Sequence, residues 1–71
     1  MNTFNHIRFI QEVEAWRKLQ DRRASWVAKQ VGRTSGFYSD LVHLKRGPGI
    51  QTAARLSVLC GLNLNLFIEK I

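Results

Sequence analysis

Basic side chains gather in the middle of this chain, where they could bind phosphate groups. Residues 17–46 hold eight lysines and arginines against two aspartates, so this segment accounts for the net charge of +6 of the whole chain. Lysine and arginine bind phosphate oxygens through charge-assisted hydrogen bonds. A basic patch of this kind is typical of a surface that binds nucleic acid. A solvated basic surface without a partner is the alternative interpretation of the same composition.

Small and polar side chains lie between these basic residues and could contact base edges. They are Ser35, Gly36, Ser39, Asp40 and His43. Hydroxyl groups hydrogen-bond to several bases, a carboxylate accepts from the cytosine amino group, and glycine lets the backbone come close. Asp40 has a second possible role, which is to orient a neighbouring basic side chain. For His43, an ordinary surface histidine is the alternative to a base or phosphate contact.

The residues predicted to contact phosphate flank this polar run. Arg33, Thr34, Lys45 and Arg46 are the first candidates, and Arg22, Arg23 and Lys29 are second-rank candidates. Phosphate contacts of this kind position a protein on the duplex but carry no sequence information.

No group of residues predicts catalysis or metal binding. His6 and His43 are far apart, and Cys60 is the only cysteine. Glu12 and Glu14 are two positions apart on a predicted helix, so they point away from each other and cannot share a proton. We therefore expect no enzyme activity, metal, cofactor or small-molecule ligand. Cys60 lies on an apolar helix face, which predicts a packing role in a reducing cytoplasm.

Hydrophobic spacing predicts the helices that carry these residues. The first helix runs from about Asn5 to Gln20 and the second from about Ala24 to Val31, with Asp21 as a candidate N-cap that Arg23 or Ser25 could replace. The first buries Phe9, Val13 and Trp16, with Ile10 on the flank and Leu19 one turn beyond; the second buries Val27, Ala28 and Val31.

Two further helices follow the turn at Gly32-Arg33-Thr34. The third runs from about Ser35 to Leu44, with Thr34 as its N-cap, and the fourth from about Gln51 to Cys60, ended by Gly61. A loop at residues 45–49 separates them, because Pro48 and two glycines cannot continue a helix. The third helix buries Tyr38, Leu41 and Val42, and the fourth buries Ala53, Leu56, Leu59 and Cys60.

The two ends of the chain are harder to predict. Residues 1–4 are expected to form a loose end. In the tail, Leu64, Phe67, Ile68 and Ile71 follow helical spacing, whereas Leu62, Leu64 and Leu66 alternate as in a strand. Leu66, Ile68 and Ile71 are the predicted dimer interface, because an exposed apolar strip on a small domain marks a contact surface. A tail that is wholly used by its own core is the alternative.

The segment from Ala24 to Cys60 resembles the Cro and phage-repressor (lambda-repressor-like) family of helix-turn-helix domains. Members often read L-A-x-x-x-G, then S-P-G-Y-L-S-D-L-L, then K-R-N-P-S-L-E-T, and then an apolar helix. This chain reads VAKQVG, RTSGFYSDLV, HLKRGPGIQT and AARLSVLCGLNL, and the similarity extends over roughly residues 13–67. It departs from the family at Arg33 and Tyr38, where aliphatic residues are usual, and at Leu44, where glycine is common.

The resemblance implies an all-α fold, a compact bundle of about five short helices in one domain spanning residues 1–71. Helices 2 and 3 would form the helix-turn-helix, and the tail at residues 62–71 would be a short fifth helix capped by Asn63. It also implies a transcription regulator, most simply a small Cro-like repressor of a phage, prophage or plasmid. Such a protein binds an inverted-repeat operator in double-stranded DNA as a homodimer.

Two other functions are kept as alternatives. One is a protein-interaction module, such as the antitoxin of a toxin pair. The other is a phage accessory factor for DNA recombination, in which the same fold bends DNA. No apolar run approaches transmembrane length, and the first residues lack a signal-peptide core. We therefore expect a cytoplasmic protein without a membrane partner.

Overall fold

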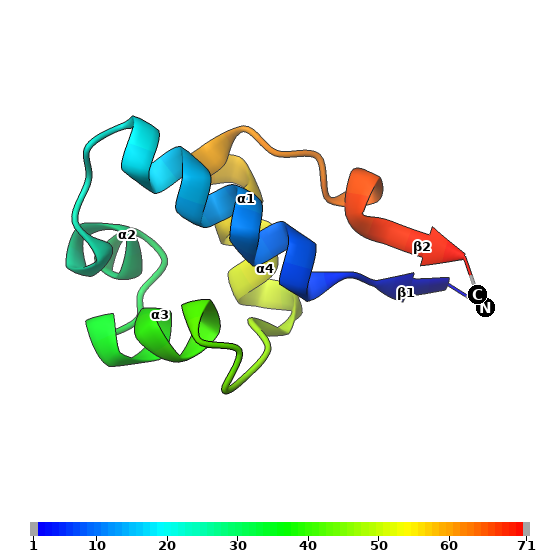
Figure 1. The fold of residues 1–71 in the computed structure, drawn as a ribbon, viewed down its shortest axis with the longest axis horizontal. Coiled ribbons are helices and arrows are strands. Elements are labelled where there is room, and N and C mark those ends of the chain that lie inside the picture. The colour runs from blue at the N-terminus through cyan, green and yellow to red at the C-terminus, as the bar shows by residue number, and fades with distance from the viewer. Residues whose placement is uncertain (1, 71) are drawn as a thin grey trace.

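A computed structural model describes residues 2–70 of the chain. Its elements in chain order are β1 (Asn2–Phe4), α1 (His6–Leu19), α2 (Ala24–Gln30), α3 (Ser35–Val42), α4 (Gly49–Cys60), a 3-10 helix η1 (Leu64–Phe67) and β2 (Ile68–Lys70). Helices α1 and α4 cross at the centre, α2 and α3 pack together at one end, and the two strands project from the other end (Figure 1).

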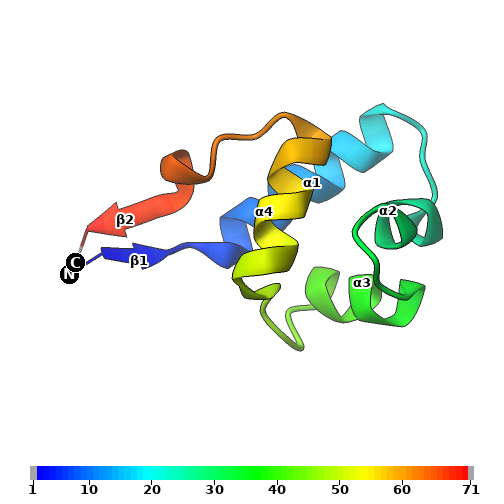
Figure 2. The same cartoon turned by 180° about the vertical axis from the view of Figure 1, so that it is seen from behind.

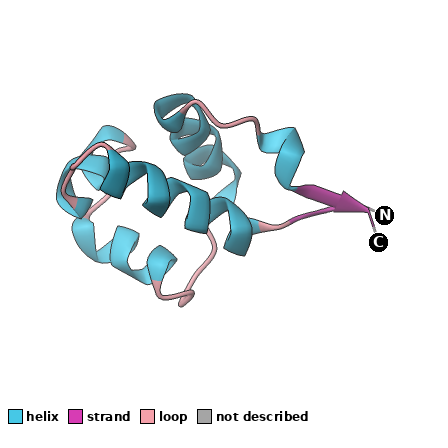
Figure 3. Cartoon of the chain, turned by 45° about the horizontal axis from the view of Figure 1, so that its top comes forward, coloured by secondary structure: helices cyan, strands magenta, loops and turns pink. Residues whose placement is uncertain are grey.

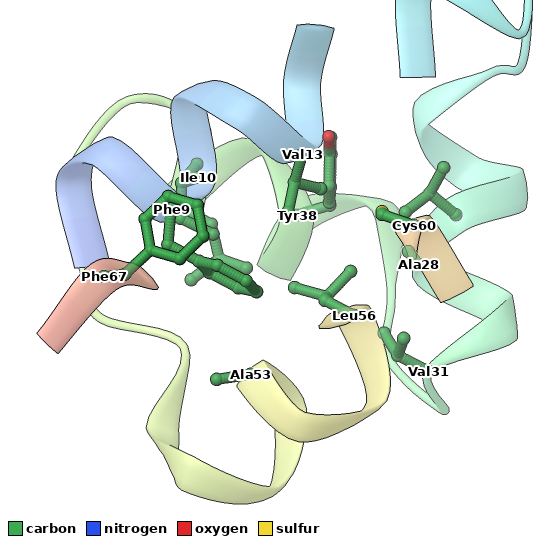
Figure 4. Close-up of a cluster of buried hydrophobic side chains, with 12 residues drawn as sticks. Phe9, Ile10, Val13, Ala28, Val31, Tyr38, Ala53, Leu56, Cys60 and Phe67 are labelled. Atoms are coloured by element: carbon green, nitrogen blue, oxygen red, sulfur yellow. The ribbon is translucent and has the colours of Figure 1, made fainter. Parts of the chain in front are cut away.

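The hydrophobic core lies between α1, α4 and the α2–α3 pair (Figure 4). Phe9 and Val13 of α1 are fully buried, as are Val27 of α2 and Leu56 of α4. The predicted inward faces are therefore confirmed for most positions. Leu19 is an exception, because it is the last residue of α1 and is 82% exposed. Trp16, Val42 and Leu59 are half-buried at the edge of the core.

Three helices end with the same backbone arrangement, in which a residue with positive φ directly follows the C-cap. At the end of α2, the Gly32 N–H donates to the Lys29 carbonyl (3.1 Å) and the Arg33 N–H donates to the Ala28 carbonyl (2.8 Å). These two hydrogen bonds together form the Schellman motif, which turns the chain sharply. Gly32 has φ +72°, as predicted for a turn glycine.

Non-glycine residues occupy the same position in α1 and α3. Asp21 has φ 54° and Leu44 has φ 61°. The left-handed conformation costs a residue with a Cβ atom about 1–2 kcal/mol, so the backbone of Leu44 is strained at this position. The prediction that Asp21 is the N-cap of α2 is wrong, because Asp21 ends α1. Arg23 is the N-cap, and its side chain makes no capping hydrogen bond.

The predicted helix boundaries need two corrections. Helix α3 ends at Val42 rather than at Leu44, because the left-handed Leu44 diverts the chain. Helix α4 begins at Gly49, one residue after Pro48, rather than at Gln51. Thr34 is the N-cap of α3 as predicted, since its Oγ1 accepts a hydrogen bond from the Phe37 N–H (3.2 Å). Gly61 adopts the predicted left-handed conformation at the end of α4.

The two ends of the chain form an antiparallel ribbon, so the prediction of a loose N-terminal end is wrong (Figure 2). The short fifth helix predicted for the tail is a single 3-10 turn, η1, and the chain then continues as β2. Asn2, Thr3 and Phe4 pair with Lys70, Glu69 and Ile68. In the tail, η1 follows Asn63, whose side chain caps it as predicted, and β2 follows η1. Leu64 and Leu66, whose alternation indicated a strand, lie in η1 instead. The fold is therefore mostly helical with a small sheet, rather than all-α. Met1 and Ile71 lie outside the described residues.

The ribbon is attached to the core by aromatic packing. Phe67 is buried, and its ring meets the ring of Phe9 edge-on with centroids 5.3 Å apart. Phe4 packs against the same Phe9 ring at 5.4 Å. The Asn5 N–H also donates to the Phe67 carbonyl (2.7 Å). Residues from both ends of the chain thus cover one end of α1.

Candidate nucleic-acid interface

Helices α2 and α3 are joined by a tight turn at residues 31–34, at the end of the molecule away from the two strands (Figure 3). The Arg55 side chain of α4 donates from Nη1 to the carbonyl of Val31 (3.2 Å), which satisfies a carbonyl at the end of α2. A Cβ atom on Gly32 would lie 3.2 Å from the same Nη1. The angle between α2 and α3 therefore depends on Gly32 and on Arg55.

A polar network anchors α3 to α1. Tyr38 is 2% exposed, and its hydroxyl donates to Glu14 Oε1 (2.9 Å). Arg17 donates to both Glu14 oxygens and, through Nη1, to the Arg22 carbonyl (2.8 Å). The hydrogen bond from Arg17 lowers the pKa of Glu14, whereas burial raises the pKa of Tyr38. The ionised Glu14 carboxylate thus connects α3, through Tyr38, with the loop before α2, through Arg17.

The outer side of α3 carries most of the residues predicted to contact bases. Ser35, Gly36, Ser39 and His43 are exposed, and Asp40 is half-buried. His43 Nδ1 lies 2.8 Å from the Ser39 carbonyl oxygen and 3.2 Å from Ser39 Oγ. A carbonyl only accepts, so Nδ1 carries the proton and Nε2 is the imidazole atom directed away from this pair. Ser39 and His43 therefore form one unit on this surface.

A basic hollow lies beside the N-terminal half of α3. We call it the α3 hollow; its lining residues are Gly32, Arg33, Thr34, Gly36, Phe37, Asp40 and Arg46. The guanidinium carbon of Arg33 stands 4.4 Å from the centroid of the Phe37 ring, and that of Arg46 stands 5.1 Å from it. Asp40 Oδ2 is 3.5 Å from Arg46 Nε. This ion pair fits the second role considered for Asp40, the orientation of a basic side chain.

A second basic hollow lies at the start of α2. It is lined by Asp21, Arg22, Arg23, Ser25, Trp26 and Lys29, which brings together the three second-rank candidates for phosphate contact. The Arg22 guanidinium stacks over the Trp26 ring, 4.3 Å from its centroid. Lys45 is exposed on the loop after α3 and lines neither hollow.

Two of the predicted dimer residues, Leu66 of η1 and Ile68 of β2, belong to elements at the opposite end of the molecule from α2 (Figure 1). Leu66 is 67% exposed and Ile68 is 45% exposed, whereas Ile71 lies outside the described residues. Ile68 borders an apolar hollow of about 350 Å³ that is also lined by Ile50, which is 86% exposed. The other lining residues are Phe4, His6, Gly47, Pro48, Gly49, Ala53 and Leu64. We call this the ribbon hollow.

Sequence reasoning missed Phe37 and Arg55. Phe37 lies between Arg33 of the turn and Arg46 of the loop. Its position one residue before the inward-facing Tyr38 is the signal that places it on the outer side. Arg55 gave no comparable signal, because its contact with the α2 carbonyl joins residues 24 positions apart.

Comparisons with known proteins give no independent identification. No protein-family model matches the chain, and neither a curated protein nor a solved structure is found to be similar to it. Across residues 2–70, no helix is long and apolar enough to cross a membrane. In the same part of the chain, no three His, Cys, Asp or Glu side chains gather where they could hold a metal ion.

Proposed function

We propose that this protein is a sequence-specific double-stranded DNA-binding regulator of transcription that uses α2, the turn and α3 as a helix-turn-helix. The carrying observation is the exposed polar side of α3, which is bordered by two arginines stacked on Phe37. In this proposal α3 enters the major groove, where Ser35, Gly36 and the Ser39–His43 pair face base edges.

Basic residues on both sides of α3 support this orientation. Arg33 and Arg46 line the α3 hollow, and Arg22, Arg23 and Lys29 line the hollow at the start of α2. Both sets would contact phosphates while α3 lies in the groove. Arg17 is excluded from this role, because its guanidinium binds Glu14 and the Arg22 carbonyl.

We further propose that the protein acts as a homodimer, in the manner of a small Cro-like repressor. Two copies of α3 about one DNA turn apart, roughly 34 Å, would read an inverted repeat. The ribbon hollow and Leu66 offer a contact surface for a second copy, because they are apolar and lie away from α2. Repression would follow most simply from occupation of the operator.

The test is selection from a pool of random duplexes at near-physiological salt, followed by sequencing of the bound fraction. An enriched inverted repeat is the expected result, and its spacing gives the distance between the two recognition helices. Binding that enriches no sequence and disappears as salt rises would reject sequence-specific recognition and leave only the attraction of a +6 chain for DNA.

A protein-interaction module is the second candidate function, and the ribbon hollow is the observation that favours it. A surface lined by Phe4, Ile50 and Ile68 suits an apolar side chain from a different protein as well as from a second copy. Native mass spectrometry of the purified protein separates the two cases. A homodimer supports the regulator, whereas a stable complex with another protein, without duplex enrichment, supports the interaction module.

A further inference from the structure

Phe37 makes none of the proposed contacts with DNA, yet it lines the α3 hollow between Arg33 and Arg46. Its side chain is half-buried against the core, and two guanidinium groups lie over its ring at 4.4 Å and 5.1 Å. Arg33 comes from the turn before α3 and Arg46 comes from the loop after α3. The ring therefore brings together two positive charges that are 13 positions apart in the sequence and would otherwise repel each other.

The chemistry of this stack favours an oxyanion ligand. The negative face of an aromatic ring attracts a guanidinium and offsets part of the repulsion between two of them. The N–H donors of arginine lie in the plane of the guanidinium, so stacking leaves them available to bind two oxygens at once. Asp40 supplies one carboxylate against two guanidiniums, so the α3 hollow keeps a net positive charge.

We infer that Phe37, Arg33 and Arg46 form a preassembled clamp for a single phosphate group, which on DNA is one backbone phosphodiester. The identity of the natural ligand, a DNA phosphate, rests on the proposed function. The geometry of the clamp does not. Phe37 acts as a positioning residue, because it touches the arginines rather than the phosphate. Asp40 orients Arg46 within the clamp through their ion pair.

Titration of the free protein with pyrophosphate tests the clamp without DNA. The titration is monitored by NMR of the arginine side chains. We expect the Nε–H signals of Arg33 and Arg46 to move and saturate together. Arg8 is the internal control, because its guanidinium carbon lies 4.9 Å from the centroid of the Phe67 ring and, within residues 2–70, no second arginine stacks on that ring. Its Nη2 donates to the Leu66 carbonyl. Its signal should move weakly. Equal and non-saturating shifts at all three arginines would overturn the inference.

Variants at Phe37 then separate the stack from a direct contact of the ring with DNA. Phe37→Leu should weaken pyrophosphate binding and duplex binding by about 3- to 10-fold, whereas Phe37→Trp, a better partner for cations, should retain both. In the Arg33→Ala/Arg46→Ala background, Phe37→Leu should have no further effect. An equal effect in both backgrounds would overturn the positioning role.

The same measurements distinguish failure of the clamp from failure of the proposed function. If the wild-type protein binds pyrophosphate at Arg33 and Arg46 but enriches no duplex, the clamp is supported and the proposed regulatory function is rejected. If the wild-type protein enriches an inverted repeat and Phe37→Leu leaves the affinity for pyrophosphate and for the duplex unchanged, the regulatory function is supported and the clamp is rejected. Circular dichroism of each variant verifies its helical content, and the wild-type titration needs no substitution at all.

Discussion

Replacement of Glu14 by glutamine tests how α1 holds α3 in place. The carboxylate accepts hydrogen bonds from Arg17 and from the buried Tyr38 hydroxyl, and both side chains of the Glu14–Arg17 pair are about one-fifth exposed. Glutamine has a similar shape, but its NH₂ group cannot accept a bond and its charge is lost. Hydrogen bonds to charged groups contribute roughly 1.5–3 kcal/mol. Because this site is partly solvated, we expect a loss of about 1–2 kcal/mol at pH 7.

The pH dependence of this loss follows from the pKa of Glu14, which the Arg17 hydrogen bond lowers in the folded state. Between the folded and unfolded pKa values the unfolded chain binds more protons, so stability rises with pH in that window. The stabilisation by Glu14 is therefore complete above the unfolded pKa, about 4.3, and decreases as the pH falls through the folded value. The difference between wild type and Glu14→Gln should shrink toward pH 3.

Urea denaturation followed by circular dichroism measures both effects. With a denaturant slope of about 1 kcal/mol per molar urea, the midpoint of Glu14→Gln should fall by about 1–2 M at pH 7. Glu12→Gln is the matched control, because Glu12 is exposed on the same helix, and it should change stability by less than about 0.5 kcal/mol. Equal midpoints for wild type and Glu14→Gln at pH 7 would refute the anchoring role. A difference that persists unchanged at pH 3 would refute the electrostatic explanation.

Three further perturbations test other parts of the structure. Gly32→Ala should reduce stability by about 1–2 kcal/mol, because alanine is strained at φ +72° and its Cβ meets Arg55. Gly47→Ala is the control, because a Cβ atom there has open space around it. Urea midpoints of both variants check this. Burial raises the pKa of Cys60 to about 11, so native protein should react with iodoacetamide at pH 8 far more slowly than unfolded protein; comparable rates would contradict that burial. Arg46→Ala should weaken binding to all duplexes and lower the slope of log affinity against log salt by about one, and an unchanged slope would remove Arg46 from the phosphate contacts.

Local signals in the sequence predicted the helices well. Thr34 and Gly32 specify their positions through a side-chain cap and a left-handed backbone, and both act within a few residues. Asp21 misled the prediction because aspartate favours an N-cap and also tolerates the left-handed conformation. The structure uses the second property, and this choice depends on how α1 ends.

The ribbon was not predictable in the same way, because its pairing joins residues more than 60 positions apart. The alternation of Leu62, Leu64 and Leu66 indicated a strand too early in the tail, because Leu64 and Leu66 lie in η1. Nothing nearby in sequence identified Asn2–Phe4 and Ile68–Lys70 as partners. In the candidate interface, the exposed side of α3 follows from the inward positions of Tyr38 and Leu41. The stack on Phe37 depends on the path of the loop after α3, which the sequence pattern leaves open.

The place of Phe67 has a consequence for the order of events during folding. Its edge-on contact with Phe9 joins residues 58 positions apart, whereas the hydrogen bonds within each helix join residues four positions apart. Contacts distant in sequence must overcome a larger loop-closure entropy, so the helices are expected to form before Phe67 reaches Phe9. Until then one end of α1 exposes an aromatic ring, and pairing of β1 with β2 marks the stage at which that ring becomes covered.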